Sequence, residues 1–398
     1  MLAAAAALLA CKKPLMDTMP RWYSRGPRSY MSGAAGAADS SAWKTPAKKG
    51  VYVAAVRFPE WADWKEGDFS GAEAVLFRDS IEIARCTMGA RPDPDRIRIR
   101  DGHLWTDITS GGVTEIYCDG AHRLTIPDEE LLKGFLIKND TLHTLGQRPG
   151  GGGICYRING EEVFSSGAGT VAGTMERDSI GLYYVYGITI RKGESALMEY
   201  HIMNGADEIK TVTPNDDGQI YDIRVRDGTV YRSERRNDNP SSLCLVIGDS
   251  FHLINVSAGE NIYQCKLIEL DGEMMIKGYS LSKNHMYHWI RAKDGVRHQV
   301  VCSLGAVSDI YADSGGLAYI LTNGDGSAAI IQVGDKDFRA DQEGLSLRFA
   351  GSRCADYKDG FFAAALSDTS GLRHRLFLGD RLVPLEFNGY FTSLTIYK

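Results

Sequence analysis

Residues 308–340 read SDIYAD-SGG-LAYILT-NGDG-SAAIIQV-GD-KDFRA, and residues 353–387 read RCADYK-DG-FFAAALS-DTSG-LRHRLFL-GD-RLVPLEF. Each stretch holds four short runs rich in Val, Ile, Leu, Tyr and Phe, which favour β-strands. Turn residues separate the runs, and a Gly-Asp pair closes the last hairpin in both. The two stretches therefore predict one repeated unit of four antiparallel strands, which we label A to D.

The tight turn between strands C and D recurs along the chain at intervals of 40 to 46 residues. Asn-Gly and Asp-Gly pairs tolerate positive φ at both central positions, so they close two-residue hairpins whose twist matches the strands. A repeat of this length with strand composition is typical of a β-propeller blade. The predicted turns are Asp119-Gly120, Asn159-Gly160, Asn204-Gly205, Gly248-Asp249, Asp294-Gly295, Gly334-Asp335 and Gly379-Asp380.

A second series of turns, between strands A and B, sets the number of blades. Gly228, Gly272, Gly316 and Gly360 are each 44 residues apart. Extending this series predicts eight four-stranded blades in an all-β propeller. A seven-bladed propeller remains the alternative if residues 170–177, which are poor in apolar side chains, form a loop. The eight turns lie near residues 50, 102, 140, 184, 228, 272, 316 and 360.

The first and last segments of this domain are complementary. The first repeat lacks a strand A, and the chain ends in NGYFTSLTIYK, a strand with nothing following it. We therefore expect residues 390–397 to pair beside residues 51–57 and close the ring, which leaves no unpaired gap between the first and last blades. Pro384 falls in a predicted strand D, at the edge of a blade, where proline is tolerated. Residues 50–398 are predicted to form one propeller domain.

The N-terminus predicts an export signal. Residues 1–10, MLAAAAALLA, are wholly apolar and are followed by Cys11. A short apolar run before a small residue is typical of a signal peptide rather than a membrane span. Leu8-Leu9-Ala10-Cys11 resembles the bacterial lipobox, which implies lipidation of Cys11, although no basic residue precedes it. An ordinary hydrophobic leader, or a mitochondrial transit peptide ending in Arg21, Arg25 and Arg28, is the alternative.

Residues 12–49 predict a flexible tether because they are rich in Ala, Gly, Ser and Pro and show no periodicity. They carry eight basic and two acidic residues, a net charge of +6. The whole chain carries −6, so residues 50–398 carry −12. A basic tether on an acidic domain suits a membrane surface. The acidic domain argues against nucleic acid, whose phosphates need a basic face.

The sequence offers no catalytic constellation and no expected metal or cofactor. Seven cysteines remain after Cys11, mostly within predicted strands, and no Cys-x-x-Cys occurs. His285 and His288 are three residues apart, a spacing that puts them on opposite faces of a strand. The turns at 215–218 and 323–326 are rich in Asn, Asp and Gly, but neither has the full ligand set of a calcium loop.

The repeats carry a family resemblance. GVYVAA at residues 50–55, followed by AVLFRDSIEIA at 74–84, resembles the unit of propeller lipoproteins of Bacteroidetes, and residues 316–338 and 359–385 follow the same pattern with drift. This chain lacks the Trp-Lys pair that the family has in its turns. The resemblance covers most of residues 50–398. It implies the fold and a cell-envelope location, on the outer membrane, but no chemistry and no functional residues.

Loops between strands B and C give the candidate ligand-binding residues, because function usually resides on propeller loops. Residues 58–72 form the longest such loop and hold Trp61 and Trp64, which could stack on sugar rings or pack back onto the propeller. Arg235 and Arg236 lie in the equivalent loop of the fifth blade, which is also explained as a solvated polar loop.

Two functional classes follow from these observations. The first is a lipid-anchored, monomeric binding or scaffold protein of the cell envelope, with a glycan or protein ligand. The second is a carbohydrate-active enzyme, a lyase or hydrolase, with carboxylates at the mouth of the channel.

Overall fold

The structure is a computed structural model, and it describes the chain from residue 46 onward with internal gaps. Cys11 and the predicted tether up to residue 45 therefore lie outside the described residues. The gaps are 61–62, 64–66, 90, 139–140, 179, 193–194, 215–217, 236–241, 256–260, 283–284, 304–306, 314–315, 323–328, 341–343, 347–353, 369 and 371.

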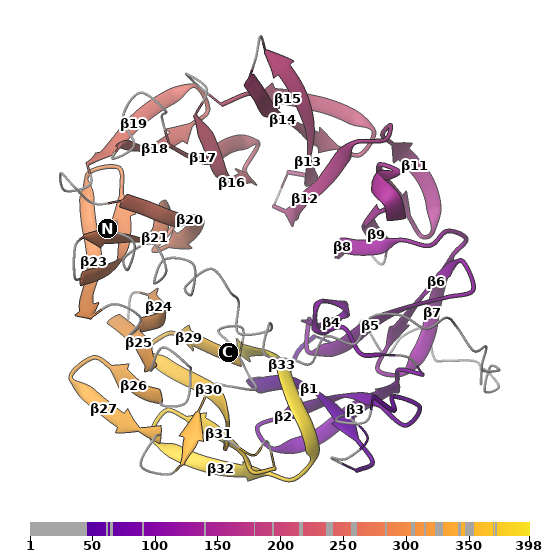
Figure 1. Cartoon of the computed structure of the whole chain (residues 1–398), viewed down its shortest axis with the longest axis vertical. Coiled ribbons are helices and arrows are strands. Elements are labelled where there is room, and N and C mark those ends of the chain that lie inside the picture. The colour runs from indigo at the N-terminus through magenta and orange to yellow at the C-terminus, as the bar shows by residue number, and fades with distance from the viewer. Residues whose placement is uncertain are drawn as a thin grey trace, which may run out of the picture. The chain divides into compact units, whose positions relative to one another are not determined.

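The described residues form eight antiparallel sheets, so the chain is a β-propeller of eight blades. Successive strands pair in chain order within blades 2 to 7, and Figure 1 labels the strands where there is room. Blades 1 to 4 comprise β33 (Asn388–Tyr397), β1 (Gly50–Phe58), β2 (Glu73–Arg78) and β3 (Ile81–Thr87); β4 (Ile97–Arg100), β5 (His103–Ser110), β6 (Val113–Cys118) and β7 (Ala121–Ile126); β8 (Leu131–Lys138), β9 (Thr141–Gln147), β10 (Ile154–Ile158) and β11 (Glu161–Ser165); and β12 (Thr170–Arg177), β13 (Leu182–Lys192), β14 (Ser195–Asn204) and β15 (Asp207–Val212).

The remaining blades follow the same plan. Short 3₁₀ helices η3 (Pro94–Arg96) and η4 (Pro149–Gly151) precede β4 and β10. Blades 5 to 8 comprise β16 (Gln219–Arg226), β17 (Thr229–Arg235), β18 (Ser242–Ile247) and β19 (Ser250–Asn255); β20 (Asn261–Leu270), β21 (Glu273–Ser282), β22 (His285–Ala292) and β23 (Gly295–Ser303); β24 (Val307–Asp313), β25 (Gly316–Thr322), β26 (Ala329–Val333) and β27 (Lys336–Arg339); and β28 (Leu345–Ser346), β29 (Ala355–Lys358), β30 (Phe361–Asp368), β31 (His374–Leu378) and β32 (Arg381–Leu385).

The eight-blade prediction is confirmed. Residues 170–177, on which the seven-bladed alternative depended, form strand β12 and pair with β13. Blade 8 departs from the plan, because its strand A is split into β28 and β29, and both pair with β30. Pro384 lies on the edge strand β32, opposite Arg375, as expected.

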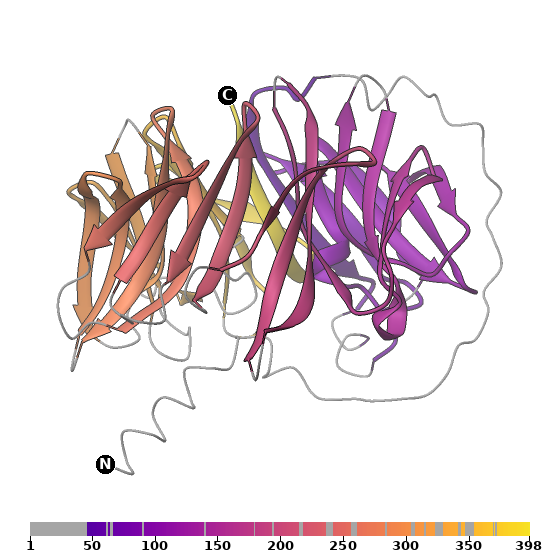
Figure 2. The same cartoon turned by 90° about the horizontal axis from the view of Figure 1, so that it is seen from above.

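The closing strand β33 pairs along the whole length of β1, which confirms the prediction for the chain ends. Gly50 faces Tyr397 and Phe58 faces Asn388, with one register shift at Ala54 and Ala55. The yellow C-terminal strand and the indigo first strand lie side by side in Figures 1 and 2. Blade 1 therefore takes its strand A from the far end of the sequence.

Contacts divide the chain into two compact units, and the dividing line runs through blade 2. One unit contains residues up to Thr106, Tyr117–His122 and Cys302–Lys398, and the other contains Asp107–Ile116 and Arg123–Val301. In the first unit, apolar clusters pack blade 7 on blade 8 and blade 8 on blade 1. In the second, similar clusters join blades 3, 4, 5 and 6 in succession. The hydrophobic core is therefore a series of clusters, each lying between two consecutive blades.

Candidate functional site

The structure describes only one of the residues predicted to bind a ligand. Trp61, Trp64 and Arg236 lie outside the described residues. Arg235 is the last residue of β17 and is half-buried. Its guanidinium makes a hydrogen bond with the hydroxyl of Tyr221, whose pKa burial raises. Arg235 also lies close enough to the Cys265 thiol to oppose the rise that burial causes in the pKa of that thiol.

The charge of Arg235 is therefore felt in the next blade, because Cys265 belongs to β20 of blade 6. The turns rich in Asn, Asp and Gly at 215–218 and 323–326 lie outside the described residues, apart from Gly218. His285 and His288 both lie on β22, one exposed and one buried, as expected for residues on opposite faces. Among the described residues, no helix is long and apolar enough to cross a bilayer.

A buried ionic cluster fastens the connection between blades 2 and 3. The Arg157 guanidinium, on β10, donates two hydrogen bonds to Glu130 Oε1, at 3.1 and 2.9 Å from Nε and Nη2. It also pairs with Asp128 and donates to the Gly160 carbonyl oxygen at 3.2 Å. Glu130 is fully buried, and burial raises its pKa although Arg157 opposes this effect. These carboxylates serve to hold a loop in place.

The same hydrogen-bonded turn between strands C and D repeats in the first three blades at intervals of 40 residues. Asp79, Asp119 and Asn159 each have positive φ, at 60°, 51° and 49°. Each backbone N–H donates to a carbonyl oxygen near the start of strand B, at 2.7 to 2.8 Å. Each side-chain Oδ1 accepts the N–H of that same strand B residue, at 2.8 to 2.9 Å. Short polar side chains tolerate this left-handed conformation, which explains Asp and Asn here.

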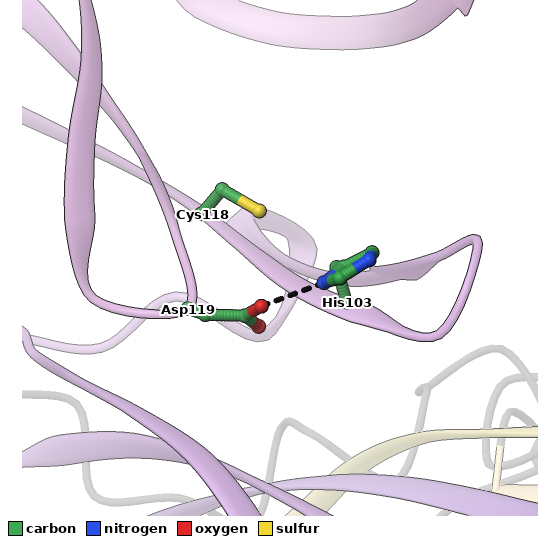
Figure 3. A group of neighbouring side chains, drawn as sticks. All are labelled: His103, Cys118 and Asp119. Carbon is green, nitrogen blue, oxygen red and sulfur yellow. Dashed lines mark hydrogen bonds and ion pairs between the residues drawn. The ribbon is translucent and has the colours of Figure 1, made fainter. Parts of the chain in front are cut away.

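Blade 2 adds to this turn two side chains of types that can ligate a metal. The strand B residue bonded to Asp119 is Leu104, and His103 precedes it; Cys118 precedes Asp119. His103 Nδ1 lies 2.6 Å from Asp119 Oδ2, the carboxylate oxygen that the turn does not use. Cys118 is fully buried, and its Sγ lies within 4.8 Å of a ligand atom of each of the other two residues. Figure 3 shows the three side chains converging at the end of the hairpin.

A pocket of about 180 Å³ opens beside this cluster. His103 and Asp119 line it from blade 2, and the A–B turn at Asp101 and Gly102 forms another wall. Blade 1 and its leading segment supply the rest of the lining: Pro46, Ala47, Lys48, Tyr52, Arg78, Ile83 and Ala84. The cluster thus combines a thiol, an imidazole and a carboxylate with an opening to solvent.

The sequence pattern alone does not predict this cluster. Turn chemistry explains Asp119, and Cys118 fits a buried thiol. The predicted ligand-binding residues lie on B–C loops, whereas the cluster lies at the A–B and C–D turns. The signal was present at the repeat interval, because blade 3 has Thr141, Ile158 and Asn159 where blade 2 has His103, Cys118 and Asp119.

Comparison with known proteins identifies no family: no family model and no curated protein matches the chain. Solved structures do match. Dihydro-heme d1 dehydrogenase NirN in complex with DHE superposes with a TM-score of 0.55 at 9% identity, over 89% of this chain and 76% of that one. BamB from Moraxella catarrhalis gives a TM-score of 0.43 at 13% identity, over 80% and 89% of the two chains.

A third match is the β-propeller domain of the Trilobed protease from Pyrococcus furiosus, with a TM-score of 0.45 at 12% identity, over 74% of this chain and 93% of that one. At 9% identity the likeness to NirN is one of fold alone.

Proposed function

We propose that the chain is a binding or scaffold protein of the cell envelope, held to a membrane by a lipid on Cys11, with a glycan or protein as its ligand. The fold supports this role, because a propeller presents loops from every blade on a rigid frame. The lipobox-like Leu8-Leu9-Ala10-Cys11 and the basic tether support the anchor.

The observation that carries the binding role is that acidic side chains hold consecutive blades together by accepting hydrogen bonds from backbone N–H groups. Asp356 accepts backbone N–H groups of Ile396 and Tyr357. Asp222 does the same for Leu267 and Ile223. A glycosidase or lyase needs two carboxylates about 5–10 Å apart that reach the substrate. Asp356 and Asp222 are committed in this way to joining blades, so neither is available as such a carboxylate, and we take this as support for binding over catalysis.

Trp61 and Trp64 are the proposed contacts for a glycan. Two tryptophans on one loop suit stacking against sugar rings, because each indole presents a large apolar face. Arg235 and Arg236 are the proposed polar contacts in blade 5. These residues come from the sequence pattern.

A glycan array probed with the purified propeller tests the ligand. We expect binding that Trp61→Ala and Trp64→Ala each reduce, while Phe251→Ala, which removes an exposed aromatic side chain of blade 5, leaves binding unchanged. Absence of binding, or binding equal in all three variants, contradicts the tryptophan surface. Release of sugar fragments from a bound glycan would favour the carbohydrate-active enzyme instead.

Membrane fractionation tests the anchor separately. The full chain should sediment with membranes and resist a high-salt wash, which removes attraction that is only electrostatic. Cys11→Ala should release it, whereas Cys86→Ala should not. A Cys11→Ala protein that stays on membranes after the salt wash would refute lipid anchoring without touching the proposed ligand surface.

A further inference from the structure

We propose that His103, Cys118 and Asp119 bind a divalent transition metal of the zinc class, with water or an added ligand entering from the adjacent pocket. Imidazole nitrogen, thiolate sulfur and carboxylate oxygen are the three donor types that zinc uses in proteins. A thiolate in the set selects a soft or borderline ion over Mg²⁺ or Ca²⁺.

The hairpin turn by itself does not require this set of residues. Blade 3 makes the same two hydrogen bonds with Asn159, and there Thr141 and Ile158 occupy the positions of His103 and Cys118. Blade 1 makes them with Asp79, and there the two positions are held by Gly50 and Arg78. The turn is therefore fully formed in two sister blades that lack the imidazole and the thiol.

The atoms lie close to the spacing that a metal imposes. Ligands at about 2.0–2.3 Å from a tetrahedral ion are separated from one another by about 3.4–3.7 Å. His103 Nδ1 and Asp119 Oδ2 lie 2.6 Å apart, and the three ligand atoms lie within 4.8 Å of one another. Side-chain rotations that move these atoms by about 1 Å would seat an ion among them, with the thiol proton released and with the imidazole proton carried by Nε2 so that Nδ1 is free to bind.

The protein geometry also leaves a coordination position open. Three protein ligands plus water is the arrangement of zinc sites that remain accessible. The pocket holds about 180 Å³, far above the roughly 10–15 Å³ that one water needs, and His103 and Asp119 both line it. Cys118 closes the inner side of the cluster, because it is fully buried. An ion would enter through the pocket and retain one face toward solvent.

Calorimetric titration of the untagged full chain with Zn²⁺ at neutral pH tests the proposal, together with Co²⁺ as a spectroscopic substitute. We expect one equivalent of Zn²⁺ per chain and a sulfur-to-cobalt charge-transfer band in the near ultraviolet. Binding should raise the thermal midpoint as Zn²⁺ is added, because the ion binds only the folded site. Absence of a saturable equivalent, or of the cobalt–sulfur band, overturns the proposal.

Repeat-matched variants separate the metal role from the turn role. Asp119→Asn copies Asn159 and His103→Thr copies Thr141, so both should fold with the metal-free thermal midpoint of the wild type. Each should weaken Zn²⁺ binding at least about 10-fold. Cys118→Ala should abolish the cobalt–sulfur band.

Asp79→Asn, the same change in blade 1, and Cys86→Ala are the controls and should bind Zn²⁺ as the wild type does. Binding by Asp119→Asn and His103→Thr at wild-type affinity would place the ion elsewhere and overturn the assignment. If one variant fails to fold, the other still decides the outcome.

Discussion

Asp356 Oδ2 accepts a hydrogen bond from the backbone N–H of Ile396 at 2.8 Å, which joins β29 of blade 8 to the closing strand β33. Its Oδ1 accepts the N–H of Tyr357 at 2.9 Å. Asp222 repeats this arrangement between blades 5 and 6, with the N–H of Leu267 at 2.9 Å. An aspartate on one strand A therefore holds the strand A of the following blade.

Replacing Asp356 with alanine should destabilise the protein by about 2 kcal/mol, because two backbone N–H groups lose a charged acceptor. Burial raises the pKa of Asp356, so part of the loss is offset by removing a half-buried charge. Urea unfolding measures the change. Asp337→Ala, on the exposed face of β27, is the control and should have little effect; an equal effect of both variants would show that the bond to Ile396 does not stabilise closure.

Gly389→Ala should be more damaging, because an added Cβ would lie 1.8 Å from the carbonyl oxygen of Val56 on β1. The backbones of β33 and β1 would have to move apart, at a cost of about 3 kcal/mol. Gly167→Ala meets no atom within 4 Å and should stay within about 0.5 kcal/mol of the wild type. Thermal unfolding of both variants checks this, and a harmless Gly389→Ala would contradict the close approach of the two strands.

Arg157→Met should destabilise the second unit by about 3–5 kcal/mol, because Glu130 then remains buried without its cation. The double variant Arg157→Met, Glu130→Gln removes both charges and should recover much of the loss. Arg148→Met breaks partly exposed pairs with Glu162 and Asp128 and should cost at most about 1 kcal/mol. Chemical denaturation of the three variants gives the comparison; a double variant as unstable as Arg157→Met would refute the paired-charge explanation.

Stability should fall as the pH drops from about 6.5 toward 4 because of His374. Burial lowers its pKa to about 4, against about 6.5 in an unfolded chain. Between these pH values the unfolded state binds more protons than the folded state. The stabilisation that comes from the uncharged His374 is therefore fully present above about pH 6.5 and is lost progressively as the pH falls toward 4. The expected loss from pH 7 to pH 5 is about 2 kcal/mol. His374→Gln should flatten this slope whatever its effect on total stability, and an unchanged slope would exclude His374 as its source.

A carboxylate, that of Asp368, titrates in a separate and more acidic range. Hydrogen bonds from Ser370 and Arg373 outweigh burial and lower the pKa of Asp368. Its stabilising contribution is present above the ordinary aspartate pKa and is lost only as the pH falls below that value. The effect of His374 can therefore be measured above pH 5 without interference from Asp368.

The fold could be predicted because its turns demand particular residues. Positive φ at Asp119 and Asn159 requires short polar side chains, so the turns mark the repeat in the sequence. The closing pair β1 and β33 followed from counting strands, since the first repeat lacked one and the end of the chain had one left over. Register shifts such as that at Ala54 and Ala55 depend on packing between strands and leave no local signal.

The candidate metal site could not be predicted in the same way. His103 and Cys118 lie on neighbouring strands and meet only because the hairpin aligns them, and neither has a metal-binding spacing along the chain. Comparing equivalent positions of successive blades would have shown that blade 2 carries ligating residues where blade 3 carries Thr141 and Ile158. The sequence predicts a loop at Arg235, whereas the residue ends strand β17 and its side chain bonds Tyr221 on the adjacent strand β16 of the same blade, a contact that needs the register of the two strands.

An engineered disulfide tests closure of the propeller by β33 most directly. Ala54 on β1 faces Ser393 on β33, and both side chains are small. The account predicts that Ala54→Cys with Ser393→Cys forms an intramolecular disulfide under mild oxidation, because facing Cα atoms of antiparallel strands lie about 4.5–5.5 Å apart, within the span of a disulfide. Ala54→Cys with Thr395→Cys, displaced by two residues, should not. Mass spectrometry of the non-reduced protein reads the result, and cross-linking of the displaced pair alone, or of neither pair, would contradict the closing strand.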